Sequence, residues 1–235
     1  MRGRVLCRPI GKMRFEEGAA FLCVFLLSRL KGSIMADPNP NIEKNFVSAE
    51  DLLQDAFELA LRVYESEFRP SFILGVWRGG APVGIAVQEV LETLGCPTNH
   101  FAIRTSTYGA RTASFDKHET LPQVQVMGLQ HVVDVVTAKD RLLIIDDIFD
   151  SGRSVDAILR ELRTRCAADT PKDIRVATIY YKSKRNLTDR TPDFYIHETD
   201  AWTVFPHELR GCTEEEIRAR GTLPKRYFDM KPKLR

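Results

Sequence analysis

The sequence predicts an α/β protein with a mainly parallel central sheet flanked by helices. Four predicted strands, at 72–76, 98–103, 141–145 and 174–180, alternate with segments of helical spacing, which is typical of parallel strands joined by helices. Within 141–145 the apolar residues follow one another without polar alternation, as expected of a strand buried on both faces. Two of the segments lead through glycines into a helix start, an arrangement that suits an anion.

The composition is that of an ordinary globular protein. The 235 residues, 43% hydrophobic and 28% charged, are enough for one large domain. A net charge of +2 gives no argument for a nucleic-acid partner. The five cysteines are odd in number and have no metal-ligand spacing, so we expect a reduced, cytoplasmic setting. They are Cys7, Cys23, Cys96, Cys166 and Cys212.

Residues 1–40 form a leader that we place outside the fold. Basic residues before position 15 precede the apolar run 19–27, as in the n- and h-regions of a signal peptide. Against a signal, Glu16 and Glu17 separate the two parts and no small-residue cleavage site follows. The run is also too short to span a bilayer, so no membrane partner is expected. A signal, a structured or membrane-touching helix, and a translation start at Met35 all stay open, and we prefer the last.

The domain, placed at 41–235, begins with a predicted helix. Ser48 with Asp51 has the spacing of a capping-box variant, and an apolar face at helical spacing follows from Leu52. After the strand at 72–76, Pro82 is placed at the first position of a second helix, and Gly95 is its predicted stop. Between that strand and helix lie Trp77, Arg78, Gly79 and Gly80.

This loop predicts a second anion site. Glycines let backbone N–H groups turn towards an anion, and Arg78 offers a forked set of donors. The polar segment 104–122 is longer than an ordinary connection, which indicates a functional or mobile loop. A half-exposed strand is expected at 123–126, whereas 129–136 fits a helix or a strand.

The most informative motif follows the strand at 141–145. Two adjacent carboxylates stand where we expect this strand to end, and a third carboxylate precedes a short hydroxylated turn and a helix. The turn and helix start suit a phosphate, while carboxylates suit ribose hydroxyls, directly or through Mg²⁺. The pattern GxxxxGK[ST] is absent. The motif residues are Asp146, Asp147, Asp150, Ser151, Gly152, Arg153 and Ser154.

Two later blocks complete the prediction. Lys182 follows the strand at 174–180, where ligands bind at the edge of a parallel sheet. A lysine there can donate to an exocyclic oxygen of a base. Trp202 begins the block Trp-Thr-Val-Phe-Pro-His-Glu, and Thr213 with Glu216 predicts a capping box for a short helix.

Over about residues 45 to 210, the phosphate motif, the Arg-Gly-Gly loop and these blocks resemble the type I phosphoribosyltransferases. The Trp202 block is similar to the Trp-x-x-x-Pro-Trp-Asp/Glu element of bacterial xanthine-guanine phosphoribosyltransferases, with His207 in place of the second tryptophan. The resemblance implies that fold, with a small hood from about 190–212 plus the N-terminal part. It also implies transfer of the 5-phosphoribosyl group of phosphoribosyl pyrophosphate (PRPP) to N9 of a 6-oxopurine.

The resemblance also implies a role for each site residue. Asp150 is the general base, and Lys182 recognises O6 of hypoxanthine, guanine or xanthine. Trp202 stacks on the base, whose edge the backbone of Thr203 and Val204 reads. The other expected roles are 5-phosphate binding by Ser151, Gly152, Arg153 and Ser154; ribose and Mg²⁺ binding by Asp146 and Asp147, with Glu208 as a further metal ligand; pyrophosphate binding by Arg78 and Gly79, with a cis Trp77–Arg78 peptide; and loop closure by Thr107 and Tyr108.

Two other functions stay open at this point. One is a PRPP-binding regulator without catalysis, and the other is a transferase for a non-purine base. The family commonly forms dimers or tetramers, so a homodimer or homotetramer is expected.

Overall fold

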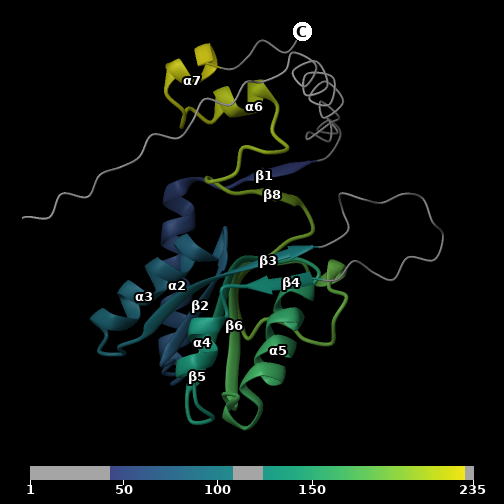
Figure 1. Ribbon diagram of the computed structural model, residues 1–235. Helices are drawn as coiled ribbons and strands as arrows, with labels where there is room; N and C mark the ends of the chain where they lie inside the picture. The colour runs from purple at the N-terminus through teal and green to yellow at the C-terminus, as the bar shows by residue number, and fades with distance from the viewer. Residues whose placement is uncertain (1–42, 108–123, 231–235) are drawn as a thin grey trace, which may run out of the picture. The chain divides into compact units, whose positions relative to one another are not determined.

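The computed structural model describes residues 43–107 and 124–230 (Figure 1). These residues fall into two compact units, within Asn41–Glu208 and within Leu209–Arg235. Each unit is described by itself.

The first unit contains a six-stranded sheet in the order β4-β3-β2-β5-β6-β7. Every neighbouring pair is parallel except β3 with β4, which is antiparallel. The mainly parallel sheet predicted from the sequence is therefore confirmed. The strands are β2 (Phe72–Trp77), β3 (Asn99–Thr107), β4 (Val124–Met127), β5 (Arg141–Phe149), β6 (Asp173–Tyr181) and β7 (Phe194–Glu198).

Helices cover both faces of this sheet (Figure 1). One core joins α2 and α3 to the sheet through Leu143 and Ile145 of β5. A second core joins α4 and α5 through Leu142 and Ile144. Because successive side chains of a strand point to opposite faces, the apolar run of β5 is buried from both sides. The helices are α2 (Ala49–Glu65), α3 (Gly80–Thr93), α4 (Gln130–Val135) and α5 (Arg153–Cys166), with short 3₁₀ turns η1 (Ala167–Asp169) and η2 (Ser183–Arg185).

The predicted helix ends are mostly confirmed. The Ser48 side chain accepts the Asp51 N–H at the start of α2, and Gly95 follows the C-cap of α3 with φ +80°. The placement of Pro82 is wrong by two residues, because α3 begins at Gly80. Proline is tolerated there since the N–H groups of a first helical turn have no intrahelical acceptor.

The end of β5 also differs from the prediction. The strand continues to Phe149, because Asp146, Ile148 and Phe149 keep pairing with β6. The acid pair therefore lies within the last part of the strand and is held by the ladder. The ambiguous segment 129–136 forms α4.

A separate two-stranded sheet joins the two ends of the first unit. β1 (Lys44–Phe46) lies parallel to β8 (Trp202–Val204), and the Val47 N–H donates to the Val204 carbonyl at 3.0 Å. This pairing joins the N-terminal part to the region predicted as a hood. The domain boundaries stay a prediction.

The second unit contains two short helices, α6 (Glu214–Ala219) and α7 (Lys225–Met230). The capping box predicted for Thr213 and Glu216 is present, and the Arg218 guanidinium lies 3.9 Å from the centroid of the Phe228 ring.

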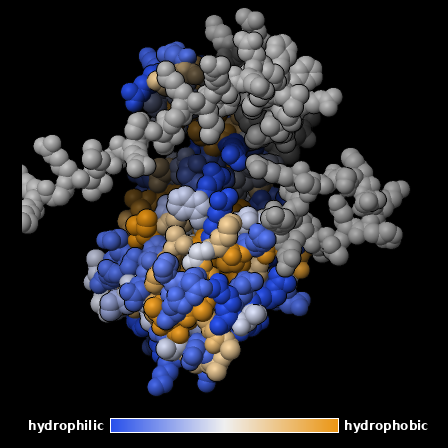
Figure 2. Space-filling model, viewed as in Figure 1, coloured by the Kyte–Doolittle hydropathy of each residue, from blue (hydrophilic) through white to orange (hydrophobic). Residues whose placement is uncertain are grey.

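The face shown in Figure 2 is mainly hydrophilic, with small hydrophobic patches between polar side chains. Among the described residues, no helix combines the length and apolar character needed to cross a membrane. Cys96, Cys166 and Cys212 are free and buried.

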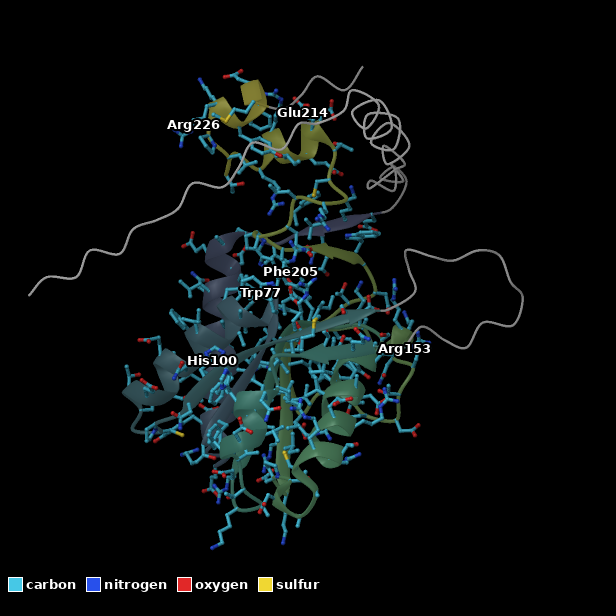
Figure 3. The ribbon with its side chains drawn as sticks, in the orientation of Figure 1. Trp77, His100, Arg153, Phe205, Glu214 and Arg226 are labelled. Carbon is cyan, nitrogen blue, oxygen red and sulfur yellow. The ribbon has the colours of Figure 1, made fainter. Side chains whose placement is uncertain are left out.

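His100 of β3 is the one histidine of the described residues whose pKa is clearly shifted by burial (Figure 3). A Cβ built on Gly75 or Gly84 would lie 2.8 Å from its Nε2, so the two glycines make the space for this ring. That nitrogen is buried and has no hydrogen-bond partner. Burial therefore lowers the pKa of His100 from its ordinary value of 6.5.

This burial predicts a loss of stability in mild acid. The unfolded state binds a proton near pH 6.5 and the folded state only at lower pH, so the stabilisation is complete above pH 6.5 and is lost as the pH falls towards the folded pKa. We expect His100→Phe to flatten urea-unfolding stability between pH 5 and 7, where one proton changes it by at most about 1.4 kcal/mol per pH unit. The exposed His131→Gln is the control. A slope unchanged in His100→Phe would contradict the assignment.

Candidate active site

The predicted loop of Arg78 and Gly79, the motif from Asp146 to Ser154, and Lys182 lie at the carboxyl ends of three adjacent strands, β2, β5 and β6. The chain leaves β2 for α3 on one face of the sheet and leaves β5 for α5 on the other. The boundary between β2 and β5 is thus a topological switch point, where ligands bind in open α/β sheets. The Trp77–Arg78 peptide after β2 is cis, as the resemblance implied.

The turn between β5 and α5 is shaped by Gly152. This residue has φ +76°, a conformation that favours glycine, and a Cβ there would lie 2.4 Å from Thr188 Oγ1. It precedes Arg153, the first residue of α5 (Figure 3), and its carbonyl accepts the Asp156 N–H at 3.0 Å. No side chain caps this helix start. The N–H groups of its first turn therefore have no side-chain acceptor at this helix start, and the 5-phosphate role of this turn stays a prediction.

The two serines of the turn differ in their surroundings. The Ser151 carbonyl accepts the Leu187 N–H at 3.1 Å, while Ser154 Oγ is 3.3 Å from Thr105 Oγ1 of β3. Thr107 ends β3, and Tyr108 lies outside the described residues. The loop-closing roles of Thr107 and Tyr108 stay predictions.

The acid pair of β5 contacts the loop that follows β2. Asp146 accepts hydrogen bonds from the backbone N–H groups of Gly80 and Asp147. Its pKa is raised well above the ordinary value, first because the carboxyl is buried and then because Asp147 is negatively charged beside it. The two acids are thus strained electrostatically and would be stabilised by a cation.

Gly79 packs directly against the second acid. A Cβ at position 79 would lie 1.6 Å from Asp147 Oδ2, although φ −69° and ψ −31° would suit any residue. Glycine is therefore required here by space and not by backbone conformation. On its other side, Asp147 Oδ2 lies 3.4 Å from His207 Nε2.

Arg78 and Glu208 form an ion pair, with Nη2 and Oε1 3.7 Å apart. Within residues 43–107 and 124–230, no three or more His, Cys, Asp or Glu side chains are grouped to hold a metal ion. Asp146 and Asp147 are adjacent in the chain, and Glu208 contacts Arg78. The metal-binding role of Glu208 stays a prediction.

Lys182 and Asp150 are brought together from the ends of two neighbouring strands, β6 and β5. Lys182 is buried, and its Nζ lies 3.6 Å from Asp150 Oδ2. The Lys182 N–H donates to the Phe149 carbonyl at 2.9 Å, which fixes the end of β6 beside the turn after β5. The structure therefore places an ammonium donor next to a carboxylate acceptor.

The aromatic block lies on β8. Trp202 is 46% exposed, so its ring has a face available for stacking, whereas Thr203 and Val204 are buried. The Val204 carbonyl already accepts the Val47 N–H. The base-binding roles of all three residues stay predictions.

Sequence reasoning assigned no site role to two residues that the structure brings to the site. Arg185 Nε lies 2.7 Å from Asp150 Oδ1, and in the sequence it reads as part of a solvated basic cluster. His207 contacts Asp147, and its ring is stacked on Phe205 with centroids 5.7 Å apart. The substitution of histidine for tryptophan in the Trp202 block was the available signal for His207.

An apolar cavity of about 410 Å³ lies between α2, α3 and the Pro206–His207 segment. It contains none of the carboxylates described above, so it is not the place of the chemistry. Its lining residues are Ala49, Leu52, Leu53, Ala56, Pro82, Val83, Ala86, Pro206 and His207.

At this switch point the structure brings together a helix start without a side-chain cap, an acid pair and a buried lysine, which are groups suited to a phosphorylated ligand. The comparison with family models identifies the class. The model of the phosphoribosyl transferase domain matches residues 44–210, which is more than half of the chain, and the chain belongs to this family. The type I phosphoribosyltransferase fold expected from the sequence is confirmed.

Solved structures agree with this fold. A purine phosphoribosyltransferase from Pyrococcus horikoshii is 23% identical, with a TM-score of 0.53, covering 73% of this chain and 98% of its own. A Neisseria gonorrhoeae protein with bound ppGpp is 18% identical, with a TM-score of 0.59 and coverages of 77% and 97%.

A third structure, the Helicobacter pylori xanthine-guanine-hypoxanthine phosphoribosyltransferase, is 18% identical, with a TM-score of 0.53 and coverages of 76% and 97%. None of the curated proteins compared with the sequence gave a match.

Proposed function

We propose that this phosphoribosyltransferase transfers the 5-phosphoribosyl group of PRPP to N9 of a 6-oxopurine and releases pyrophosphate. The observation that carries the proposal is the pair formed by the Lys182 ammonium and the Asp150 carboxylate, 3.6 Å apart. In a 6-oxopurine, O6 accepts hydrogen bonds and the adjacent N7–H donates one. A neighbouring donor and acceptor in the protein match this edge.

The same pair discriminates between bases. Lysine carries donors only, so Lys182 favours the oxygen at C6 and is unfavourable to the amino group of adenine. Its side chain is buried, and an amino group at C6 would set one hydrogen-bond donor against another in this buried place, which is costly. Hypoxanthine, guanine and xanthine are all compatible with this contact.

Asp150 is the general base of the proposed reaction. N9 forms a bond to C1′ of the ribose, the bond from C1′ to the pyrophosphate oxygen breaks, and the proton on N7 passes to the Asp150 carboxylate. This carboxylate follows β5 in the turn that leads to α5. Proton transfer to a positioned carboxylate is a standard contribution to such a reaction.

The remaining residues bind the phosphates. The N-terminus of α5 holds the 5-phosphate, and the Arg78–Gly79 loop faces the pyrophosphate, on which negative charge develops as it leaves. Trp202 supplies an exposed ring for stacking on the base.

The acid pair fits Mg²⁺, because carboxylate oxygens are the donors this ion prefers and because burial, together with the neighbouring Asp147 carboxylate, raises the pKa of Asp146. Asp146 and Asp147 would hold the ion, which would bind ribose hydroxyls and offset the negative charge of the pyrophosphate. Magnesium, a cytoplasmic setting and a homo-oligomer stay predictions.

Replacing Lys182 tests the choice of base. Nucleotide formation from PRPP and Mg²⁺ would be measured with hypoxanthine, guanine, xanthine, adenine, uracil and orotate in parallel. In Lys182→Met we expect kcat/KM for the 6-oxopurine to fall about 10- to 100-fold, because a hydrogen bond to a charged, buried group is lost. The KM for PRPP should change little.

Lys184→Met is the matched control, since Lys184 is exposed and pairs with Asp200. Turnover of adenine or a pyrimidine alone would refute the 6-oxopurine assignment. PRPP binding without turnover of any base would instead indicate a regulator.

A further inference from the structure

The segment after β6 packs against the turn between β5 and α5 and is hydrogen-bonded to it. The Lys182 N–H donates to the Phe149 carbonyl at 2.9 Å, and the Leu187 N–H donates to the Ser151 carbonyl at 3.1 Å. Asn186 Oδ1 lies against Gly152, where a built Cβ would approach it to 2.9 Å. Residues 182–188 therefore form a second wall for the turn that carries Asp150.

Two charged side chains of this wall, Arg185 and Lys182, reach Asp150. Arg185 Nε lies 2.7 Å from Oδ1, while Lys182 Nζ faces Oδ2 at 3.6 Å. The backbone fixes this arrangement, because the Arg185 N–H donates to the Lys182 carbonyl at 3.1 Å. Each oxygen of the Asp150 carboxylate thus has its own cation. Arg185 belongs to η2, and Lys182 directly precedes this 3₁₀ turn.

The two cations have different environments. The Lys182 side chain is 7% exposed and the Arg185 side chain is 60% exposed. Asp150 Oδ1 is buried and has no hydrogen-bond partner, so its close contact is the ion pair with Arg185. Without the guanidinium, a buried carboxylate oxygen would be left uncompensated and the carboxylate could rotate.

We propose that Arg185 is a positioning residue, which holds Oδ1 of Asp150 so that Oδ2 is presented beside the Lys182 ammonium to the edge of the base. This inference rests on the proposed function, in which Asp150 receives the proton from N7 of the base. Arg185 does not itself touch the base. Its effect on the reaction passes through Asp150.

The neighbouring Lys184 provides a matched control within the same turn. Its Nζ lies 2.6 Å from Asp200 Oδ2, and its side chain is 81% exposed. Lys184→Ala removes a cation of the turn without removing a contact to Asp150. A merely electrostatic or structural effect of the turn would therefore be seen in both variants.

The test is a double-mutant cycle between Arg185→Ala and Asp150→Asn, run with whichever base the wild-type protein converts. We expect Arg185→Ala to lower kcat about 10- to 100-fold, part of the contribution of a general base, with little change in the KM for PRPP. In the Asp150→Asn background the same substitution should change kcat less than about twofold, since residues acting as a unit are not additive. Arg185→Lys should recover part of the loss, and Lys184→Ala should resemble the wild type.

Two results would overturn the positioning role. One is a loss of kcat in the double variant that equals the product of the losses in the two single variants. The other is a raised KM for PRPP at unchanged kcat, which would place Arg185 on a phosphate. Thermal unfolding of each variant identifies any that fail to fold, in which case Arg185→Gln completes the cycle.

The wild-type base panel separates this proposal from the proposed function. Conversion of only a non-6-oxopurine refutes the base assignment while the cycle still decides the role of Arg185. Absence of turnover with every base overturns both.

Discussion

Gly79→Ala is expected to lower PRPP-dependent turnover about 100-fold or more, the scale of losing a preorganised group that stabilises developing charge. The added Cβ would lie 1.6 Å from Asp147 Oδ2 and 2.0 Å from its Cγ. Since Asp147 is buried, the carboxylate and the loop proposed to hold the pyrophosphate must both shift. Overpacking of this kind also destabilises proteins by about 1–3 kcal/mol. Steady-state kinetics and urea unfolding would measure the two effects.

A second substitution shows whether the cause is steric. In Gly79→Ala/Asp147→Ala the space is restored, so we expect part of the lost stability to return while turnover stays low. Gly95→Ala is the matched control, because Gly95 has φ +80° and no atom within 4 Å of a built Cβ. It should lose stability through backbone strain of about 1–2 kcal/mol and keep its activity. Normal turnover in Gly79→Ala would contradict the packing argument.

Asp150→Asn is expected to slow nucleotide formation about 10²- to 10⁴-fold, the usual contribution of a general base. The amide keeps the shape of the carboxylate but cannot take the N7 proton. PRPP binding should be nearly unchanged, since the phosphates are assigned to the α5 N-terminus and the Arg78–Gly79 loop. Single-turnover kinetics would measure the chemical step, and calorimetry would measure the dissociation constant of PRPP.

The control for this substitution is Asp189→Asn, which makes the same chemical change at an exposed turn residue. A single-turnover rate of Asp150→Asn equal to that of the control would remove Asp150 from the proton transfer. The proposed function would then need another base.

Local patterns were sufficient for much of the fold. The unbroken apolar run 142–145 predicted a strand buried on both faces, and its residues are 0% exposed. Ser48, Gly95 and the Thr213–Glu216 pair predicted helix ends that the structure contains. These signals succeed because hydrophobic periodicity, capping and positive φ act within a few residues of chain.

The end of β5 was less predictable. Polar residues at 146 and 147 suggested that the strand stops, but its ladder with β6 continues to the Phe149–Tyr181 pair. Pairing with a partner strand overrides the local preference of a carboxylate for a turn.

The sequence by itself therefore determined the parallel α/β fold, the glycine turn before α5 and the presence of Asp150 and Lys182 at neighbouring strand ends. Only the tertiary structure decided that Arg185 faces Asp150, that Gly79 leaves room for Asp147, and that His207 lies beside the same carboxylate. The residues in these contacts are 35 to 68 positions apart in the chain. They meet because the register of β2, β5 and β6 brings the ends of these strands together. Sequence spacing does not predict these side-chain contacts, because they depend on how the strands are aligned and on how the side chains pack in the fold.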